Sequence, residues 1–169
     1  MANSWLKPDF DNILHELKAI DNWVLAKEVM RDGKVTKPPF QPSGRPASHS
    51  DPSTWSSFEA VARAYQKGGY IGVGFVLDGK PHFKGRYLHG FDWDNCFENG
   101  KLAPGIAAEL HRLGISRIEK SISGKGIRGF FLHDQALSSR RTQIQGRSVE
   151  LYSSNRYLTT TGIGAGMLR

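Results

Sequence analysis

Seven short apolar runs, most of them adjacent in the sequence, constrain the fold of this chain more than any other feature. The runs are rich in β-branched and aromatic residues and are bounded by turn residues, as is typical of strands. Because few helices separate them, the fold is predicted to be α+β, with a largely antiparallel or mixed sheet and not a doubly wound parallel one. The expected strands are residues 23–29, 70–77, 87–94, 117–120, 127–132, 149–152 and 156–161.

Three segments have the spacing of amphipathic helices. The first covers residues 10–19. In the second, Ser53 or Thr54 is expected to cap a helix that ends at a pair of glycines. The third begins near Pro104 and ends at Gly114, a position that suits a left-handed cap.

Two connections are recognisable from their composition. The segment 33–50 is rich in Pro, Gly, Ser and Lys and is predicted to be a long loop, which is either functional or disordered. A second loop carries Asp78 and Gly79 and separates the strands at 70–77 and 87–94, which are predicted to be neighbours in the sheet.

Size and composition narrow the class of protein. The chain has 169 residues, of which 38% are hydrophobic and 23% charged, so residues 1–169 are expected to form one globular domain. No apolar run approaches the roughly 20 residues of a membrane-spanning helix, and the N-terminus shows no secretory or transit signal. The single cysteine, Cys96, cannot form an internal disulfide or a thiolate zinc site. These features predict a cytoplasmic protein.

The net charge of +7 is concentrated in the last part of the sequence. Residues 101–169 carry 11 basic and 4 acidic side chains, whereas the residues before them carry 12 of each. A basic region of this kind indicates a polyanionic partner such as nucleic acid or a nucleoside triphosphate. The alternative is a basic domain that binds no nucleic acid.

Two carboxylates stand at the end of the expected strand 87–94. Because side chains alternate along a strand, Asp92 and Asp94 are predicted to point to one face, about 7 Å apart. Their repulsion is relieved when a divalent cation lies between them, and carboxylate oxygens suit Mg²⁺ or Mn²⁺. The alternative is a strand that ends in a solvated acidic turn.

A glycine-rich turn precedes the expected strand 127–132. The run Ser-Ile-Ser-Gly-Lys-Gly, which begins at Ser121, lets backbone N–H groups approach an anion, and Lys125 and Arg128 add positive charge. The pattern predicts a phosphate-binding turn, although it lacks the spacing of a Walker loop. The alternative is an ordinary turn with a solvated lysine.

A third acidic residue, Glu150, lies in the expected strand 149–152, whose other members are apolar or aromatic. Glutamate is rarely buried without a partner, and a metal ion or an arginine would supply one. The alternative is a carboxylate on the solvent face of the strand.

Taken in order, the three motifs resemble those of the archaeo-eukaryotic primase superfamily, and more closely the primase-polymerase domains at the N-termini of phage and plasmid replication proteins. The superfamily's Asp-x-Asp strand is matched by Asp92 and Asp94, and its hydrophobic residue followed by an acid is matched by Val149 and Glu150. Its second motif leads from a Ser-x-Ser-Gly-x-Gly turn to a histidine, but Arg128 stands at that position here. An arginine at this position can still bind phosphate, but unlike histidine it cannot transfer a proton near neutral pH.

The resemblance extends over nearly the whole chain. Trp23 before a basic strand, the run Lys37-Pro38-Pro39, and Arg156 before a Thr-Gly pair also match. The resemblance implies an RRM-like catalytic sheet joined to a smaller N-terminal α/β unit, with the active site in the cleft between them. It implies templated nucleotidyl transfer, in which a 3′-hydroxyl attacks the α-phosphate of a nucleoside triphosphate.

The resemblance also implies roles for individual residues. The catalytic residues, which would hold Mg²⁺ or Mn²⁺, are Asp92, Asp94 and Glu150. The residues implied to bind the triphosphate are Ser123, Lys125, Arg128 and Arg156. The candidates for contacts with the template backbone are Lys37, Arg140, Arg141 and Arg147. The last three of these also fit a solvated basic loop.

The implied partners are a single-stranded DNA template, nucleoside triphosphates, and a helicase, either as a C-terminal domain or as a separate protein. The implied location is the cytoplasm of a bacterial cell that carries a phage or another mobile element. Two other classes stay open at this point. A metal-dependent nuclease could use the same carboxylates, and a non-catalytic nucleic-acid-binding module could retain the fold with a decayed site at Arg128.

Overall fold

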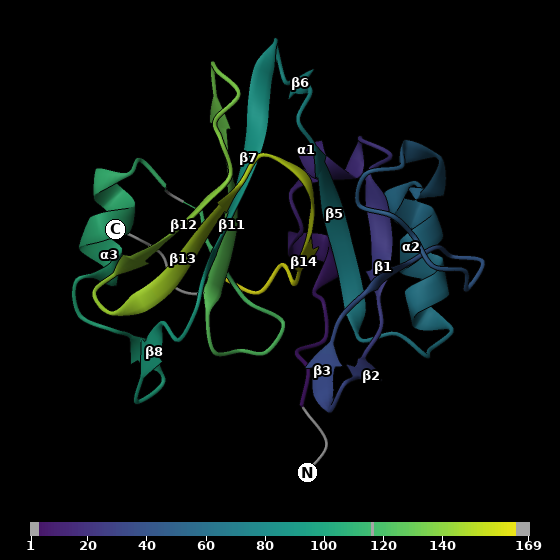
Figure 1. Ribbon diagram of the computed structural model, residues 1–169, viewed down its shortest axis with the longest axis horizontal. Helices are drawn as coiled ribbons and strands as arrows, with labels where there is room; N and C mark the ends of the chain where they lie inside the picture. The colour runs from purple at the N-terminus through teal and green to yellow at the C-terminus, as the bar shows by residue number, and fades with distance from the viewer. Residues whose placement is uncertain (1–3, 116, 165–169) are drawn as a thin grey trace.

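Two antiparallel β-sheets form most of the structure, a computed structural model that describes residues 4–115 and 117–164 (Figure 1). Within those ranges every strand pair is antiparallel, which confirms the predicted α+β class. The four-stranded sheet has the order β14-β5-β1-β4. Its strands are β1 (Trp23–Ala26), β4 (Pro39–Phe40), β5 (Gly72–Asp78) and β14 (Ser154–Thr160).

The six-stranded sheet has β7 near its centre, in the order β10-β11-β7-β13-β12, and β6 adds a short pairing to β7. Its strands are β6 (Pro81–His82), β7 (Arg86–Trp93), β10 (Glu119–Lys120), β11 (Ile127–His133), β12 (Arg140–Ile144) and β13 (Arg147–Tyr152). Two separate hairpins are β2 (Val29–Arg31) with β3 (Lys34–Thr36), and β8 (Phe97–Glu98) with β9 (Lys101–Leu102).

The helices lie outside the sheets. In the described part of the chain they are α1 (His15–Lys18), α2 (Phe58–Gln66) and α3 (Ile106–Arg112), with 3-10 turns at Phe10–Asn12 and Pro52–Thr54. The helix α2 lies beside the four-stranded sheet and α3 beside the six-stranded sheet, at opposite ends of the molecule (Figure 1). None of these helices has the length and apolarity needed to cross a bilayer.

A row of aromatic rings joins α2 to both sheets. The Trp23 ring of β1 packs edge-on against Phe58 of α2 at 4.9 Å between ring centroids, and against Phe75 of β5 at 5.3 Å. Phe75 in turn meets Phe130 of β11 at 5.9 Å. A second core lies between the six-stranded sheet and α3, where Trp93 and other apolar strand residues cover Ile106. The two sheets are therefore held against each other by apolar contacts and not by the chain connections alone.

The chain passes from one sheet to the other at Ser153, the one residue between β13 and β14. Ser153 is buried, and its hydroxyl lies 3.0 Å from Nδ1 of the buried His89 on β7. The His89 Nε2 lies 3.1 Å from the carbonyl of Gln135. Burial lowers the pKa of His89 and so favours the neutral ring, in which Nε2 donates to the Gln135 carbonyl and Nδ1 accepts from the Ser153 hydroxyl. This crossing places β13 and β14 on either side of the site described below.

Two of the three expected helices differ in detail from those observed. The segment 10–19 is not one helix, because Ile13 and Leu14 have extended backbone angles that let Ile13 be buried; only the predicted end at Ala19 is confirmed. The cap of α2 is Ser57, whose hydroxyl accepts from Ala60 N, and not Ser53 or Thr54. The predicted left-handed cap at Gly114 is confirmed by its φ of 69°.

Two predictions about connections were wrong. The strands at 70–77 and 87–94 are not neighbours, because β5 and β7 each lie inside a different sheet and pair there on both sides. The segment 33–50 is not only a loop, since β3 and β4 lie within it. The basic residues Arg140 and Arg141 are also not on a loop but on β12, a strand without an apolar face and therefore without a sequence signal.

Candidate functional site

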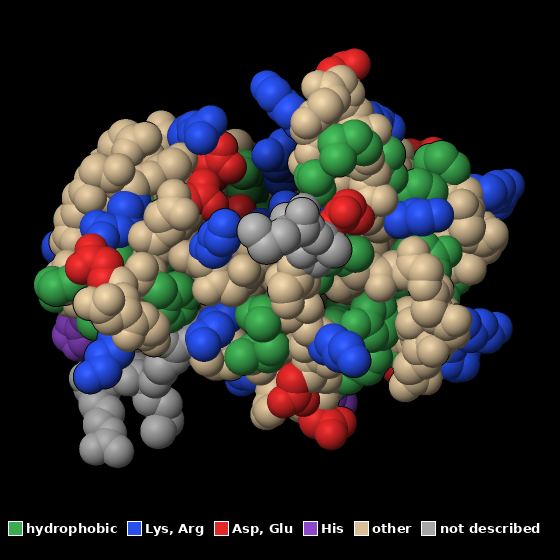
Figure 2. All heavy atoms as spheres, turned by 90° about the horizontal axis from the view of Figure 1, so that it is seen from below, with side chains coloured by type: hydrophobic (Ala, Val, Ile, Leu, Met, Phe, Trp, Pro, Cys, Tyr) green, Lys and Arg blue, Asp and Glu red, His purple; other side chains and the backbone are tan. Residues whose placement is uncertain are grey.

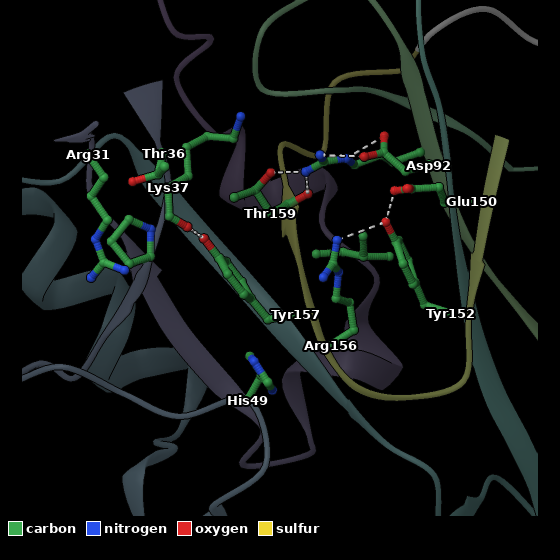
Figure 3. A pocket seen from close by; sticks show the side chains of 13 residues that line it. Arg31, Thr36, Lys37, His49, Asp92, Glu150, Tyr152, Arg156, Tyr157 and Thr159 are labelled. Atoms are coloured by element: carbon green, nitrogen blue, oxygen red, sulfur yellow. Dashed lines mark hydrogen bonds and ion pairs between the residues drawn. The ribbon is translucent and has the colours of Figure 1, made fainter. Parts of the chain in front are cut away.

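A cavity of about 520 Å³ lies between the six-stranded sheet and the outer edge of β14. One wall consists of strands β7, β11 and β13, and the other of β14, the β2–β3 hairpin and the segment around His49 (Figure 3). The molecule seen from below shows acidic and basic side chains close together near its middle (Figure 2). The residues that line the cavity are Arg31, Thr36, Lys37, Pro38, His49, Asp92, Arg128, Glu150, Tyr152, Arg156, Tyr157, Leu158 and Thr159.

Charged residues form a row across the six-stranded sheet at the first wall. Asp92 on β7 is paired in register with Arg128 on β11 and with Glu150 on β13. Directly paired residues of antiparallel strands point to the same face of a sheet. Asp92 and Glu150 therefore share one face, as the sequence motifs require. Asp94 follows two residues later, just past the end of β7, where its backbone N donates to the carbonyl of Ser148 at 3.0 Å.

Arg128 is held in place by two elements. Its Nε and Nη2 donate to the two carboxylate oxygens of Asp92 at 2.9 and 2.8 Å, and its Nη1 donates to the Thr159 carbonyl at 3.2 Å. The side chains of Arg128 and Asp92 are only 11% and 15% exposed, so water screens this two-pronged pair weakly. Arg128 thus links the wall formed by the six-stranded sheet to β14, and most of its donors are already used.

The charge on the Asp94 side of the row is unbalanced. Partial burial raises the pKa of Asp94, the negative charge of Asp92 raises it further, and Glu150 adds to this, while Arg128 offsets part of the effect. Within the described part of the chain, the Asp94 backbone forms hydrogen bonds, but its side chain has no hydrogen-bond or ion-pair partner. An excess of negative potential at an exposed carboxylate favours a bound cation.

Glu150 is oriented by its neighbours. It accepts a short hydrogen bond from the Tyr152 hydroxyl, and Arg141 Nε lies 3.3 Å from its Oε1. Burial and the bond to Glu150 raise the pKa of Tyr152 to about 12, so its hydroxyl remains a donor at neutral pH. Arg156 Nη2 donates to the same hydroxyl at 3.2 Å, and its guanidinium lies 4.7 Å from the Tyr152 ring centroid (Figure 3). Arg156 is exposed and lines the cavity.

The opposite wall is basic. The Tyr157 hydroxyl donates a short hydrogen bond to the carbonyl of Lys37, which fixes β14 against the start of β4. Burial lowers the pKa of Lys37, as does the nearby Arg128, while Asp92 and Asp94 oppose this shift. Lys37 lines the same cavity as Asp92, and its Nζ lies 5.1 Å from the centroid of the Trp5 ring. Arg31 and His49 lie on the same side of the cavity (Figure 3).

The carboxylates fit a divalent cation by type and by face, since Mg²⁺ and Mn²⁺ prefer hard oxygen ligands. Their present arrangement is open: across residues 4–115 and 117–164, no three His, Cys, Asp or Glu side chains converge closely enough to hold a metal ion. Both oxygens of Asp92 are turned toward Arg128. Glu150 is also engaged, by the Tyr152 hydroxyl at one oxygen and by Arg141 near the other, so Asp94 is the carboxylate with the most capacity for a cation.

The glycine-rich turn lies outside the cavity lining. The amide of Gly124 donates to the Ser121 carbonyl at 2.7 Å, and that of Gly126 to the Ser121 hydroxyl at 3.0 Å. A Cβ on Gly126 would lie 2.5 Å from the carbonyl oxygen of Trp93, so glycine permits close packing on β7. The turn thus uses these amides internally, and phosphate binding by Ser123 and Lys125 stays a prediction.

The cavity unites five of the residues singled out in the sequence, which are Asp92, Glu150, Arg128, Arg156 and Lys37. Arg140, Arg141 and Arg147 lie outside its lining, and Arg147 donates to the Asn95 carbonyl at 2.8 Å. Sequence reasoning missed the lining residues Arg31, His49, Tyr152 and Tyr157. The signal that could have found His49 is its position in the long segment 33–50, whose length in a small domain indicates function.

Comparison with known proteins gives one informative match. No protein family model matches the chain. The chain is 31% identical over 145 residues to a curated protein named DNA primase-polymerase from Nitratiruptor phage NrS-1. The aligned segment covers 83% of this chain but 19% of the relative, so the chain spans about a fifth of the relative's length.

Proposed function

The chain is a relative of phage-type primase-polymerases, and we propose that it carries out template-directed nucleotidyl transfer from nucleoside triphosphates on single-stranded DNA. One observation supports this most: Asp92 and Glu150 stand side by side at one wall of a cavity whose opposite wall is basic. A cavity of about 520 Å³ is within the usual range for small ligands, roughly 300–1,000 Å³. Carboxylates on one wall and basic side chains on the other suit a triphosphate with its bound metal ion.

The triphosphate would lie between the two walls. Arg156 and Lys37 would bind its phosphate oxygens, with Arg31 and His49 completing the basic side. A 3′-hydroxyl oxygen would form a bond to the α-phosphorus, the bond from that phosphorus to the bridging oxygen would break, and pyrophosphate would leave. The hydroxyl proton would pass to solvent.

Asp94 and Glu150, with Asp92, would hold Mg²⁺ or Mn²⁺. A divalent ion in this position supplies charge neutralisation at the leaving oxygens and lowers the pKa of the attacking hydroxyl. Arg128 would act by holding Asp92 in position, since the structure shows its guanidinium on that carboxylate.

The same ion pair favours a second candidate function. Because Arg128 engages both oxygens of Asp92, a chain that never binds a metal could still bind nucleic acid through the basic wall. Such a module would bind single-stranded DNA and fail to bind nucleotide and metal.

Primer extension on a single-stranded DNA template tests the proposal. Ribo- and deoxyribonucleotides are supplied separately, with Mg²⁺ or Mn²⁺, beside a lane without nucleotides. We expect nucleotide-dependent extension that is lost in Asp92→Asn and kept in the control Asp21→Asn, an exposed carboxylate far along the chain from the site. Degradation without nucleotides indicates a nuclease, and DNA binding without extension indicates the non-catalytic module.

A further inference from the structure

The charged row that contains Asp92 continues across five strands of the six-stranded sheet. Beyond Arg128 it reaches Glu119 on β10, which is paired in register with Arg128. Beyond Glu150 it reaches Arg141 on β12, which is paired in register with Glu150. Directly paired residues of antiparallel strands point to one face of a sheet, so all five side chains share the face of the carboxylates. The two ends of this row, at Glu119 and at Arg141, have different surroundings.

The Glu119 end of the row is closed by β14. The Glu119 carboxylate accepts hydrogen bonds from the Thr160 hydroxyl and from the backbone N of Thr161, both at 2.9 Å. Arg128, the next member of the row, donates to the Thr159 carbonyl at 3.2 Å. These three threonines are buried. The two sheets are therefore joined at this end, and a nucleic-acid strand cannot enter between them here.

The Arg141 end of the row is open. The β12–β13 hairpin projects away from β14 (Figure 1), and in the described part of the chain β12 pairs with β13 alone. The Arg141 side chain is 67% exposed, with its Nε 3.0 Å from the Ser148 hydroxyl and 3.3 Å from Oε1 of Glu150. Across residues 4–115 and 117–164, its two terminal nitrogens have no hydrogen-bond partner. Arg141 is thus oriented through Nε and can still bind a ligand through its Nη groups.

The register separates the three arginines that the sequence singled out in this region. Arg140 is paired with Leu151 and, by the alternation of side chains, points to the face opposite to Arg141. Arg147 also lies on that opposite face, where its Nη2 forms an ion pair with Glu98. Arg141 is therefore the one of the three that shares a face with the carboxylates.

We propose that the strand carrying the attacking 3′-hydroxyl reaches the cavity across the exposed face of the β12–β13 hairpin, with one of its backbone phosphates on Arg141. This inference rests on the proposed function. It deepens that function by assigning a path to the primer strand and by separating Arg141 from the neighbouring arginines.

The geometry of the proposed reaction favours this direction of approach. In phosphoryl transfer, the attacking and leaving oxygens lie roughly in line on opposite sides of the phosphorus. The proposed function puts the leaving pyrophosphate at the basic wall, near Arg156 and Lys37. The 3′-hydroxyl would therefore approach from the carboxylate wall, and the open end of that wall is at Arg141.

The dimensions and the chemistry of the hairpin face fit a nucleic-acid strand. Neighbouring strands lie about 4.8 Å apart, so Arg141 is about 10 Å beyond Asp92 along the row. At about 3.4 Å per stacked nucleotide, a phosphate on Arg141 belongs to the last three or so nucleotides of the primer. A guanidinium binds phosphate with charge-assisted hydrogen bonds. Gln143 and Ser148, which are paired in register beside Arg141, add neutral hydrogen-bonding groups to the same face.

Fluorescence anisotropy with a labelled primer–template duplex tests the contact, in Mg²⁺ without nucleotide so that no synthesis occurs. One duplex is unmodified. A second has uncharged methylphosphonates at the last three linkages of the primer, and a third has them at the facing linkages of the template. We expect Arg141→Ala to bind the unmodified and the template-modified duplex about fivefold more weakly than the unchanged protein does. On the primer-modified duplex, the two proteins should bind equally, because the phosphate partner is already neutral.

Arg140→Ala is the matched control, because it removes an exposed arginine of the same strand from the opposite face. It should bind all three duplexes as the unchanged protein does. Both arginines are exposed, so neither substitution should unfold the protein, and thermal unfolding checks this.

The results separate this inference from the proposed function. If the unchanged protein extends primers but Arg141→Ala binds like Arg140→Ala, the primer contact is overturned and the proposed function stands. If methylphosphonates in the template, and not in the primer, abolish the effect of Arg141→Ala, the assignment to the primer is overturned. If the unchanged protein binds none of the duplexes, both are overturned. Loss of the Arg141 effect on the primer-modified duplex alone supports the inference, and without extension it counts only against nucleotidyl transfer.

Discussion

The two walls of the cavity differ in how firmly their charges are fixed. On the six-stranded sheet, Asp92 is held by two hydrogen bonds from Arg128, and Glu150 by Tyr152 and Arg141. On the opposite wall, the exposed Arg31 comes from the end of a hairpin, and His49 from an irregular segment. The carboxylate wall is thus organised before any ligand binds, whereas the basic wall presents cations with greater freedom.

The difference indicates that the two walls have different functions. Groups that stabilise a reacting centre need fixed positions, because reorganisation during the reaction costs free energy. Groups that bind a flexible polyanion need charge more than exact geometry. Substitutions on the carboxylate wall should therefore change stability and catalysis together, while substitutions on the basic wall should change affinity alone.

The largest expected effect is that of Asp92→Asn. It should lower primer extension by about 100-fold or more, since it removes a carboxylate at the reacting centre. It should also lower the free energy of unfolding by about 3 kcal/mol, because it leaves the buried Arg128 without its counter-charge. Denaturant unfolding measures the second effect. Unchanged stability would contradict the assigned role of this ion pair.

A second prediction tests whether position 128 needs the planar guanidinium of arginine or only a positive charge. Arg128→Lys keeps the charge but cannot donate two parallel bonds to Asp92 while reaching Thr159, so it should destabilise the protein by about 1–3 kcal/mol. Chemical denaturation of Arg128→Lys beside Arg63→Lys gives the comparison, since Arg63 is an exposed arginine of α2. Equal stabilities for the two variants would show that Arg128 acts only as a charge.

The basic wall predicts a purely binding effect. Arg156→Ala should raise the KM for nucleoside triphosphate about tenfold, the worth of one charge-assisted contact, with the free energy of unfolding within about 0.5 kcal/mol of the unchanged protein. Steady-state kinetics at saturating template measures it. A fall in kcat at constant KM would instead assign Arg156 to the chemical step, together with the carboxylate wall.

The smallest expected effect is the pH dependence of stability at Asp94. Its pKa is raised in the folded protein by partial burial and by Asp92, so the folded state disfavours the charged carboxylate. The resulting destabilisation is fully present above the raised pKa and disappears below the unfolded value near 3.8. Without divalent ions, Asp94→Asn should therefore be slightly more stable than the unchanged protein at pH 7 and no more stable at pH 3. Thermal unfolding at both pH values checks the sign.

The sequence predicted the parts of the site that depend on regular alternation. Asp92 and Glu150 have apolar neighbours in the sequence that predict a strand around each of them. The strands and the shared carboxylate chemistry could therefore be predicted from short segments of the sequence. That the two residues lie side by side depends on how β7 and β13 pair. The motifs alone do not predict this pairing; only the resemblance to the primase superfamily implied that the two residues share a site.

Other features depend on long-range packing that local patterns do not encode. The polar strand β12 has no apolar face, and the placement of β5 and β7 in different sheets follows from which partners each strand finds. The sequence predicts that Arg128 binds phosphate. Only the fold shows that its guanidinium already donates hydrogen bonds to Asp92 and Thr159. Along the chain, His49 is separated from Asp92 by α2, β5 and β6, so no spacing rule connects them.

The position of a bound triphosphate tests the central claim most directly. A crystal structure of the chain with a non-hydrolysable nucleoside triphosphate and Mn²⁺ would locate the phosphates by density and the metal by its anomalous signal. The account predicts the triphosphate between the two walls, with Arg156 and Lys37 at its phosphates and Mn²⁺ at the Asp94 and Glu150 carboxylates. A triphosphate bound at the Ser121–Gly126 turn, or Mn²⁺ away from these carboxylates, would contradict it.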